Sequence, residues 1–275
     1  MKNIKVYLQF ALITIIIAVI YRSTFIWLFE RFSEPDSYYS HGFLIPLVTG
    51  ILIWQKKEKL RAITPESSGL GIILLLIGSL TQIASVITEV YLVSEISLFL
   101  NIFGIVLFLY GKKTCRELFF PLSFLAFMIP IPMFLINQIS FPMRLIVTNS
   151  VVLTLSVLGL PITQKGFEII FPNTTLVVDT PCSGLRSLIA FLALGSLFAY
   201  FLRGALKKKI LLFLMAIPIA FITNFLRIAF LSLTAFVYGA QVATKSVFHD
   251  LSGIFVFVLG IILFNIVRGI LNERI

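Results

Sequence analysis

The sequence is poor in charge and in the side chains that most often hold metals or form disulfides. Charged residues make up 12% of its 275 positions, and it has only two cysteines and two histidines. A soluble domain usually carries about a quarter charged residues. No polar stretch is long enough to fold as a separate soluble domain. These shortages exclude a soluble globular enzyme.

Apolar residues are abundant and come in long runs. They make up 59% of the chain, the mean hydropathy is +1.05, and the runs have the roughly 17 to 25 residues that cross a bilayer. We therefore predict an all-α polytopic membrane protein with about eight transmembrane helices, forming a single domain over 1–275. No small-residue cleavage site follows the first run, so we expect a retained helix. The predicted spans lie near residues 7–29, 42–54, 69–87, 92–110, 118–136, 184–202, 210–237 and 251–267.

The loops between these spans alternate in charge. One predicted side carries most of the 22 basic residues, and the richer side should be cytoplasmic. Both termini are then cytoplasmic, in a multi-pass protein of the cell inner membrane. The net charge of +10 is explained by this orientation, so we predict no nucleic-acid partner. The residues on the richer side are Lys2, Lys5, Lys56, Lys57, Lys59, Arg61, Lys112, Lys113, Arg116, Arg203, Lys207, Lys208, Lys209, Arg268 and Arg274.

Two segments do not fit a simple series of spans. Residues 138–160 are apolar enough to cross, but a crossing there would place the later basic cluster outside. We predict an interfacial or re-entrant segment whose Arg144 and Asn149 face protein or water. Residues 167–171 and 176–178 are rich in β-formers around a Pro-Asn turn, which predicts a small extracytoplasmic β-hairpin. The active-site half of the chain should be about 138–275.

Three chemically capable residues are predicted at the same depth on the outer side. Cys182 should lie in the first turn of the sixth span, where the helix dipole and Arg186 on the same face favour the thiolate. Arg227 lies near the outer end of the seventh span. His249 opens the last span, and Asp250 beside it could raise its pKa. Taken alone, each has an ordinary structural explanation: a small buried hydrophobe, a snorkelling or structurally paired arginine, and a solvated histidine.

The conjunction of these residues is more informative than any one of them. A cysteine nucleophile, a histidine acid–base and an arginine that stabilises an oxyanion are the parts needed for acyl transfer through a thioester. Metal binding is disfavoured because no cysteine and histidine have ligand spacing, so we predict no metal and no cofactor. Ser183 is a weaker nucleophile than its neighbour. Cys115 lies on the predicted cytoplasmic side, so we expect no internal disulfide.

At these residues the chain resembles the exosortase/archaeosortase family of multi-spanning cysteine transpeptidases. The motifs that carry the resemblance occur in the same order as in the family and span most of the chain. It rests on Tyr38-Tyr39-Ser40-His41-Gly42, Gly166-Phe167-Glu168-Ile169, Pro181-Cys182-Ser183-Gly184-Leu185-Arg186-Ser187, Asn224-Phe225-Leu226-Arg227-Ile228 and Phe248-His249-Asp250-Leu251-Ser252-Gly253.

The resemblance implies a Cys–Arg–His active site on the extracytoplasmic face, formed by Cys182, Arg227 and His249. It also implies secreted substrates with a C-terminal sorting tail: a short motif such as Pro-Glu-Pro, a transmembrane helix and a basic end. The enzyme would cleave at the motif and pass the new carboxyl end to water, a membrane lipid or another envelope acceptor. We expect the following residues to bind substrate or support the site: Arg186, Asn224, His41, Ser183 and Asp250.

Two other kinds of function remain open from the residues. A transporter or an envelope or polysaccharide assembly scaffold would tolerate Cys182→Ser and would line a path through the membrane with polar residues. The scarcity of ionisable residues in the predicted cytoplasmic half argues mildly against a conduit. Nothing in the residue pattern excludes a membrane acyltransferase that uses Cys182 on a lipid-linked donor. Only the family resemblance argues against it.

Overall fold

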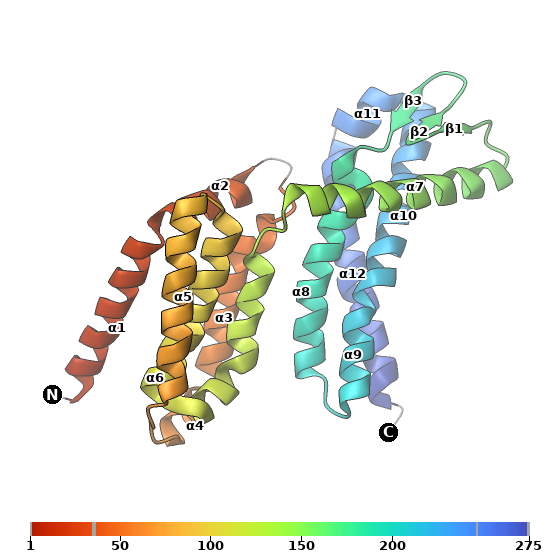
Figure 1. The fold of residues 1–275 in the computed structure, drawn as a ribbon. Helices are drawn as coiled ribbons and strands as arrows, with labels where there is room; N and C mark the ends of the chain where they lie inside the picture. The colour runs from red at the N-terminus through yellow and green to blue at the C-terminus, as the bar shows by residue number, and fades with distance from the viewer. Residues whose placement is uncertain (1, 35–36, 246, 274–275) are drawn as a thin grey trace. The chain divides into compact units, whose positions relative to one another are not determined.

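The computed structural model describes residues 2–34, 37–245 and 247–273, and they form helices with one small sheet (Figure 1). The chain divides into two compact units, Met1–Ile131 and Pro132–Ile275. The helices of the first unit are α1 (Lys2–Ile20), α2 (Arg22–Ser33), α3 (Leu44–Gln55), α4 (Lys57–Ala62), α5 (Gly69–Thr88) and α6 (Tyr91–Phe124), with 3₁₀ turns η1 (Ser40–Phe43) and η2 (Leu125–Met128). Those of the second are α7 (Met133–Val157), α8 (Leu185–Phe201), α9 (Leu206–Leu214), α10 (Ala216–Tyr238), α11 (Ala240–Lys245) and α12 (Val247–Glu273), with η3 (Thr180–Ser183).

In the first unit, α5 and α6 pack closely because small residues lie between them. A Cβ on Gly71 would lie 2.3 Å from the backbone nitrogen of Phe108, so only glycine permits this approach. Polar side chains join α6 to its neighbours: Ser97 Oγ lies 2.6 Å from Tyr21 Oη, and Ser94 Oγ lies 2.6 Å from Thr24 Oγ1. Such hydrogen bonds hold helices together where lipid offers no partner.

The predicted number of eight spans is not confirmed. In the described residues, five helices are long and apolar enough to cross a membrane, or up to six if α1 and α2, bent by 74°, form one span. The predicted spans 92–110 and 118–136 both involve α6, which has a non-helical residue at Gly111 (φ 80°). Two other predicted spans correspond to shorter apolar helices, Ser40–Gln55 and Leu185–Phe201. The polytopic helical membrane fold itself is confirmed.

In the second unit, α8, α10 and α12 run side by side, and α7 lies across one end of them (Figure 1). By length and composition α7 could cross a membrane, but its crosswise direction fits the predicted interfacial segment. Arg144 is half-buried against protein, whereas Asn149 is exposed. The guanidinium of Arg144 lies 4.1 Å from the centroid of the Phe167 ring, and Asn149 Oδ1 accepts a hydrogen bond from Gln164.

The predicted hairpin is present as part of a three-stranded antiparallel sheet. Strands β2 (Glu168–Ile170) and β3 (Thr175–Val177) form the hairpin, with Ile169 opposite Leu176. Strand β1 (Thr163–Lys165), which pairs with β2, was missed because Thr-Gln-Lys carries no apolar alternation. Ile169 and Leu176 of the sheet are buried in one cluster with Val151 of α7 and Ile228 of α10.

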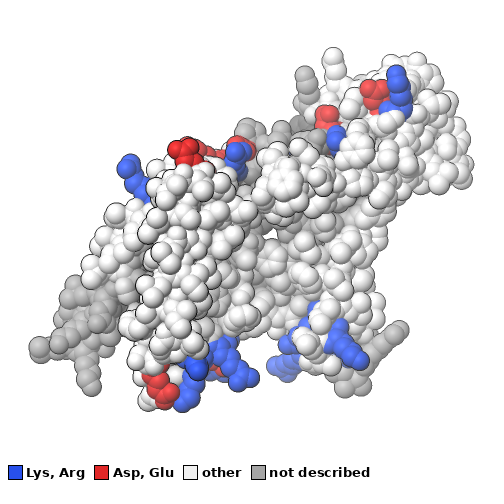
Figure 2. All heavy atoms as spheres, in the orientation of Figure 1, with Lys and Arg blue, Asp and Glu red and all other residues white. Residues whose placement is uncertain are grey.

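Basic side chains gather at one end of each unit, considered separately (Figure 2). In the first unit, Lys56 binds Glu117 at 3.1 Å and Lys113 binds Glu66 at 3.2 Å. In the second, the cluster is Arg203, Lys207, Lys208 and Lys209. These are the loops that the charge distribution predicted to be cytoplasmic.

Candidate functional site

Cys182 lies in a short turn before α8, not in the first turn of that helix. Its backbone N–H donates to the carbonyl of Asp179 at 2.9 Å, which closes the 3₁₀ turn η3. Gly184 then adopts a left-handed conformation (φ 84°), and α8 begins at Leu185. The prediction that Cys182 shares a helix face with Arg186 is therefore wrong, because the left-handed glycine between them separates the turn of Cys182 from helix α8. The half-buried cysteine packs against the core formed by the sheet, α7 and α10.

Ser183 is a structural residue of this turn. It is 1% exposed, and its Oγ accepts a hydrogen bond from the backbone N–H of Leu185 at 3.2 Å. A hydroxyl at this position satisfies one of the amide groups that the first turn of a helix leaves without a partner.

Asn224 on α10 holds the cysteine turn in place. Its Nδ2 donates to the carbonyl oxygen of Cys182 at 3.1 Å, and the side chain is 2% exposed. The turn approaches so closely that a Cβ on Gly184 would lie 2.9 Å from Asn224 Cγ. Its Oδ1 is buried and has no hydrogen-bond partner among the described residues. We expected Asn224 to support the site, and its contact is with the backbone of the cysteine.

Arg227 lies one turn further along α10 and contacts α12. Its Nε donates to Ser252 Oγ at 3.1 Å, and Ser252 is 3% exposed. Residues three apart lie on the same face of a helix, so one face of α10 contacts both the cysteine turn and the start of α12. Ser252 was missed as a contact, although it lies inside the motif around His249.

His249 and Asp250 lie within α12, but their side chains fall outside the described residues. Their roles stay predictions. The backbone of α12 begins at Val247, and His249 precedes Ser252 by three positions. Positions with this spacing share one helix face. Arg227 therefore binds α12 at a position, Ser252, that shares a helix face with position 249.

His41 belongs to the first unit, whereas the cysteine turn belongs to the second. It is half-buried beside the 3₁₀ turn η2, and burial lowers the pKa of its imidazole, partly offset by a hydrogen bond to the backbone of Phe127. The two tyrosines before it are buried within the first unit. Tyr38 is 9% and Tyr39 4% exposed, and Tyr39 Oη accepts from the backbone N–H of Ile131 at 2.8 Å.

In the described part of the chain, no group of three or more His, Cys, Asp or Glu side chains could hold a metal ion. Cys115 lies in α6 of the first unit, and neither it nor Cys182 forms a disulfide. In the second unit, α10 contacts both the turn that bears the half-buried thiol of Cys182 and the helix that bears His249.

Comparison with known proteins places this arrangement in a family. No curated protein and no solved structure matches the chain. A family profile described as transmembrane exosortase (Exosortase_EpsH) matches residues 27–266 and so includes the cysteine turn, the polar face of α10 and the start of α12. The chain belongs to the transmembrane exosortase family.

Proposed function

We propose that this protein is a membrane-embedded cysteine protease or transpeptidase that cleaves the C-terminal sorting signals of secreted proteins. The observation that carries the proposal is the pair of hydrogen bonds from one face of α10. Asn224 binds the backbone of Cys182, and Arg227 binds Ser252 on the helix that bears His249. Membership of the exosortase family supports the same reaction class.

In the proposed reaction, the thiolate of Cys182 attacks the scissile carbonyl, and the resulting oxyanion binds the guanidinium of Arg227. His249 protonates the leaving amine as the C–N bond breaks. The acyl group then remains on sulfur as a thioester. Water or an acceptor amine attacks it, and the thiol leaves. The substrate would carry a sorting motif, a transmembrane helix and a basic tail, and the site would face the extracytoplasmic side.

The test is processing of a co-expressed secreted reporter that carries a panel of candidate sorting tails. The parent, Cys182→Ala and Cys182→Ser are compared at equal membrane abundance, with Cys115→Ala as the matched control. We expect cleavage in the parent and in Cys115→Ala only. Cleavage in both Cys182 variants at the parental rate would exclude the cysteine mechanism. Mass spectrometry of the new C-terminus then separates hydrolysis from transfer.

A further inference from the structure

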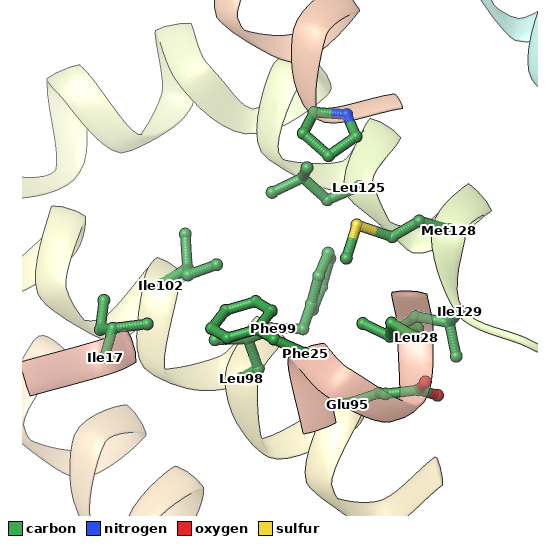
Figure 3. Close-up of a pocket in the computed structure, with 11 residues that line it drawn as sticks. Ile17, Phe25, Leu28, Glu95, Leu98, Phe99, Ile102, Leu125, Met128 and Ile129 are labelled. Carbon is green, nitrogen blue, oxygen red and sulfur yellow. The ribbon is translucent and has the colours of Figure 1, made fainter. Parts of the chain in front are cut away.

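Two ionisable side chains outside the proposed catalytic residues differ in how far a ligand could reach them. Glu95 of the first unit adjoins an apolar cavity of about 170 Å³ (Figure 3), but both of its oxygens are buried and the cavity wall exposes no polar surface. A ligand in that cavity therefore has no access to the carboxyl group. Arg144 of the second unit is only half-buried, so part of its side chain is accessible.

Arg144 is the only charged residue of α7, and it lies on the side of this helix that faces protein. Ser140, Val147 and Val151 line the same side and are at most 1% exposed, as their spacing of three and four positions predicts. Ile146 lies on the opposite side and is exposed. An arginine that only anchored α7 to lipid headgroups would be expected on that exposed side. Arg144 is instead directed toward the second unit.

The protein-facing side of α7 lies next to the cysteine turn. Helix α7 contacts η3, and Val147, one turn after Arg144, belongs to the buried cluster against which Cys182 packs. The guanidinium of Arg144 lies 4.1 Å from the centroid of the Phe167 ring. The carbonyl of Phe167 accepts a hydrogen bond from the N–H of Val178, four residues before Cys182. Arg144 is therefore beside the segment that leads into the proposed nucleophile.

The guanidinium of Arg144 has donors that the described residues do not use. Its Nε is buried without a hydrogen-bond partner among them, and the salt bridges of the described residues all join other side chains. The contact with the Phe167 ring engages the positive charge but fills none of the N–H donors. The planar fork of arginine matches the two oxygens of a carboxylate. Arg144 therefore calls for an acidic partner that the described residues do not supply.

We propose that Arg144 binds the side-chain carboxylate of an acidic residue in the substrate's sorting motif, beside the bond that Cys182 attacks. This inference rests on the proposed cleavage function and adds to it a residue that determines specificity. The motif precedes the transmembrane helix of the substrate, so it lies at the outer interface, the level predicted for α7. No bond is made or broken at Arg144. The carboxylate accepts hydrogen bonds from the guanidinium, which positions the scissile carbonyl at the thiol.

The test is binding of labelled tail peptides to the purified full-length Cys182→Ala protein in detergent micelles, measured by fluorescence anisotropy. Two peptides share a transmembrane helix and a basic end and differ only in the motif, Pro-Glu-Pro or Pro-Gln-Pro. We expect the glutamate peptide to bind roughly tenfold more tightly, as a charge-assisted hydrogen bond would give. Arg144→Gln in the same background should bind both peptides equally. The matched control, Arg203→Gln at an exposed position of the second unit, should keep the preference.

A second measurement reverses the charges and follows cleavage of the co-expressed reporter, with Cys182 intact. Arg144→Glu should cleave a Pro-Lys-Pro tail faster than a Pro-Glu-Pro tail, the opposite order from the parent. A residue that only held α7 in place would slow both tails alike. The parental order of the two tails in Arg144→Glu would therefore contradict recognition by Arg144.

The binding measurement separates recognition from cleavage. Equal affinity of the Cys182→Ala protein for the two peptides, or a glutamate preference that survives Arg144→Gln, would overturn the proposal whatever the reporter shows. The first of these results would fit an arginine that binds another anion, such as a lipid phosphate. A glutamate preference that depends on Arg144, in a parent that cleaves no tail, would support recognition and overturn the proposed cleavage function.

Discussion

Arg227 has a position that serves both structure and the proposed chemistry. Its Nε contact to Ser252 fixes the direction of the guanidinium across the gap between α10 and α12. Arginine presents a planar fork of donors, whereas lysine is a point charge on a flexible stem. If Arg227 binds the oxyanion, a lysine at this position should not support cleavage, because it keeps the positive charge but loses the planar fork of donors.

We predict that Arg227→Ala lowers the rate of reporter cleavage by roughly 10²–10³-fold, the usual cost of one oxyanion donor. Arg227→Lys should also be strongly impaired because it loses the fork. Initial rates are measured by quantitative immunoblot at equal membrane abundance. Arg268→Lys, at the other end of α12, is the control and should cleave normally. Parental rates in Arg227→Lys would rule out the oxyanion role.

His41 predicts a pH dependence of stability. Burial lowers the pKa of its imidazole in the folded protein. In the unfolded chain the imidazole has the usual histidine pKa of about 6.5. Between these two pKa values the unfolded chain binds more protons than the folded protein. Stability contributed by neutral His41 is therefore complete above the unfolded pKa and is lost as the pH falls below about 6.5. We expect the thermal midpoint in detergent to fall from pH 7.5 to 5.5, and to fall less in His41→Asn. Equal slopes in both proteins would contradict this.

At the scale of elements, the cysteine turn depends on a close approach between η3 and α10. Gly184 has a positive φ, and a Cβ there would meet the buried Asn224 side chain. Gly159 also has a positive φ (88°), but a Cβ there would meet nothing within 4 Å. The two glycines therefore form a matched pair, with nearly equal positive φ angles and a clash at only one of them.

We predict that both Gly184→Ala and Gly159→Ala incur roughly 1–2 kcal/mol of left-handed backbone strain, but that only Gly184→Ala loses cleavage of the reporter. The added methyl group displaces Asn224 and with it the hydrogen bond to Cys182. Thermal unfolding measures the strain, and reporter cleavage measures the site. Normal cleavage by Gly184→Ala would show that the Asn224 contact does not position the cysteine.

Helix α7 is the element whose path the sequence left most open. If it lies along the outer interface, both of its ends are reachable from outside. We predict that Phe134→Cys and Val157→Cys, each in a Cys115→Ala background with Cys182→Ala, both react with a membrane-impermeant maleimide on intact cells. Both positions are exposed, at 61% and 78%. Labelling of one position only after permeabilisation would show instead that α7 crosses.

At the scale of the whole molecule, the distribution of basic residues predicts one orientation for the chain. Loops rich in lysine and arginine stay in the cytoplasm, which places both termini inside. We predict that a C-terminal fluorescent protein fusion is bright and that the corresponding alkaline phosphatase fusion is inactive. Replacing Lys207, Lys208 and Lys209 by glutamine should weaken this bias in the second unit. An active phosphatase fusion to the parent would reverse the assigned sides.

Composition and short motifs by themselves determined the membrane class, the family and the candidate residues. Apolar runs of spanning length have few alternatives, since a helix satisfies its backbone groups internally. The β2–β3 hairpin was also predictable because β-rich segments flank a Pro-Asn turn. These features depend on local patterns, so they can be read without knowledge of packing.

Tertiary structure alone decided the third strand and the local conformation at Cys182. A left-handed glycine ends the turn before α8, and its reason lies 40 residues away in Asn224, which a local pattern does not reveal. The role of Ser252 became apparent only from the Arg227 side chain that packs beside it. Contacts between distant segments determine which polar side chains find hydrogen-bond partners, and the proposed active site depends on such contacts.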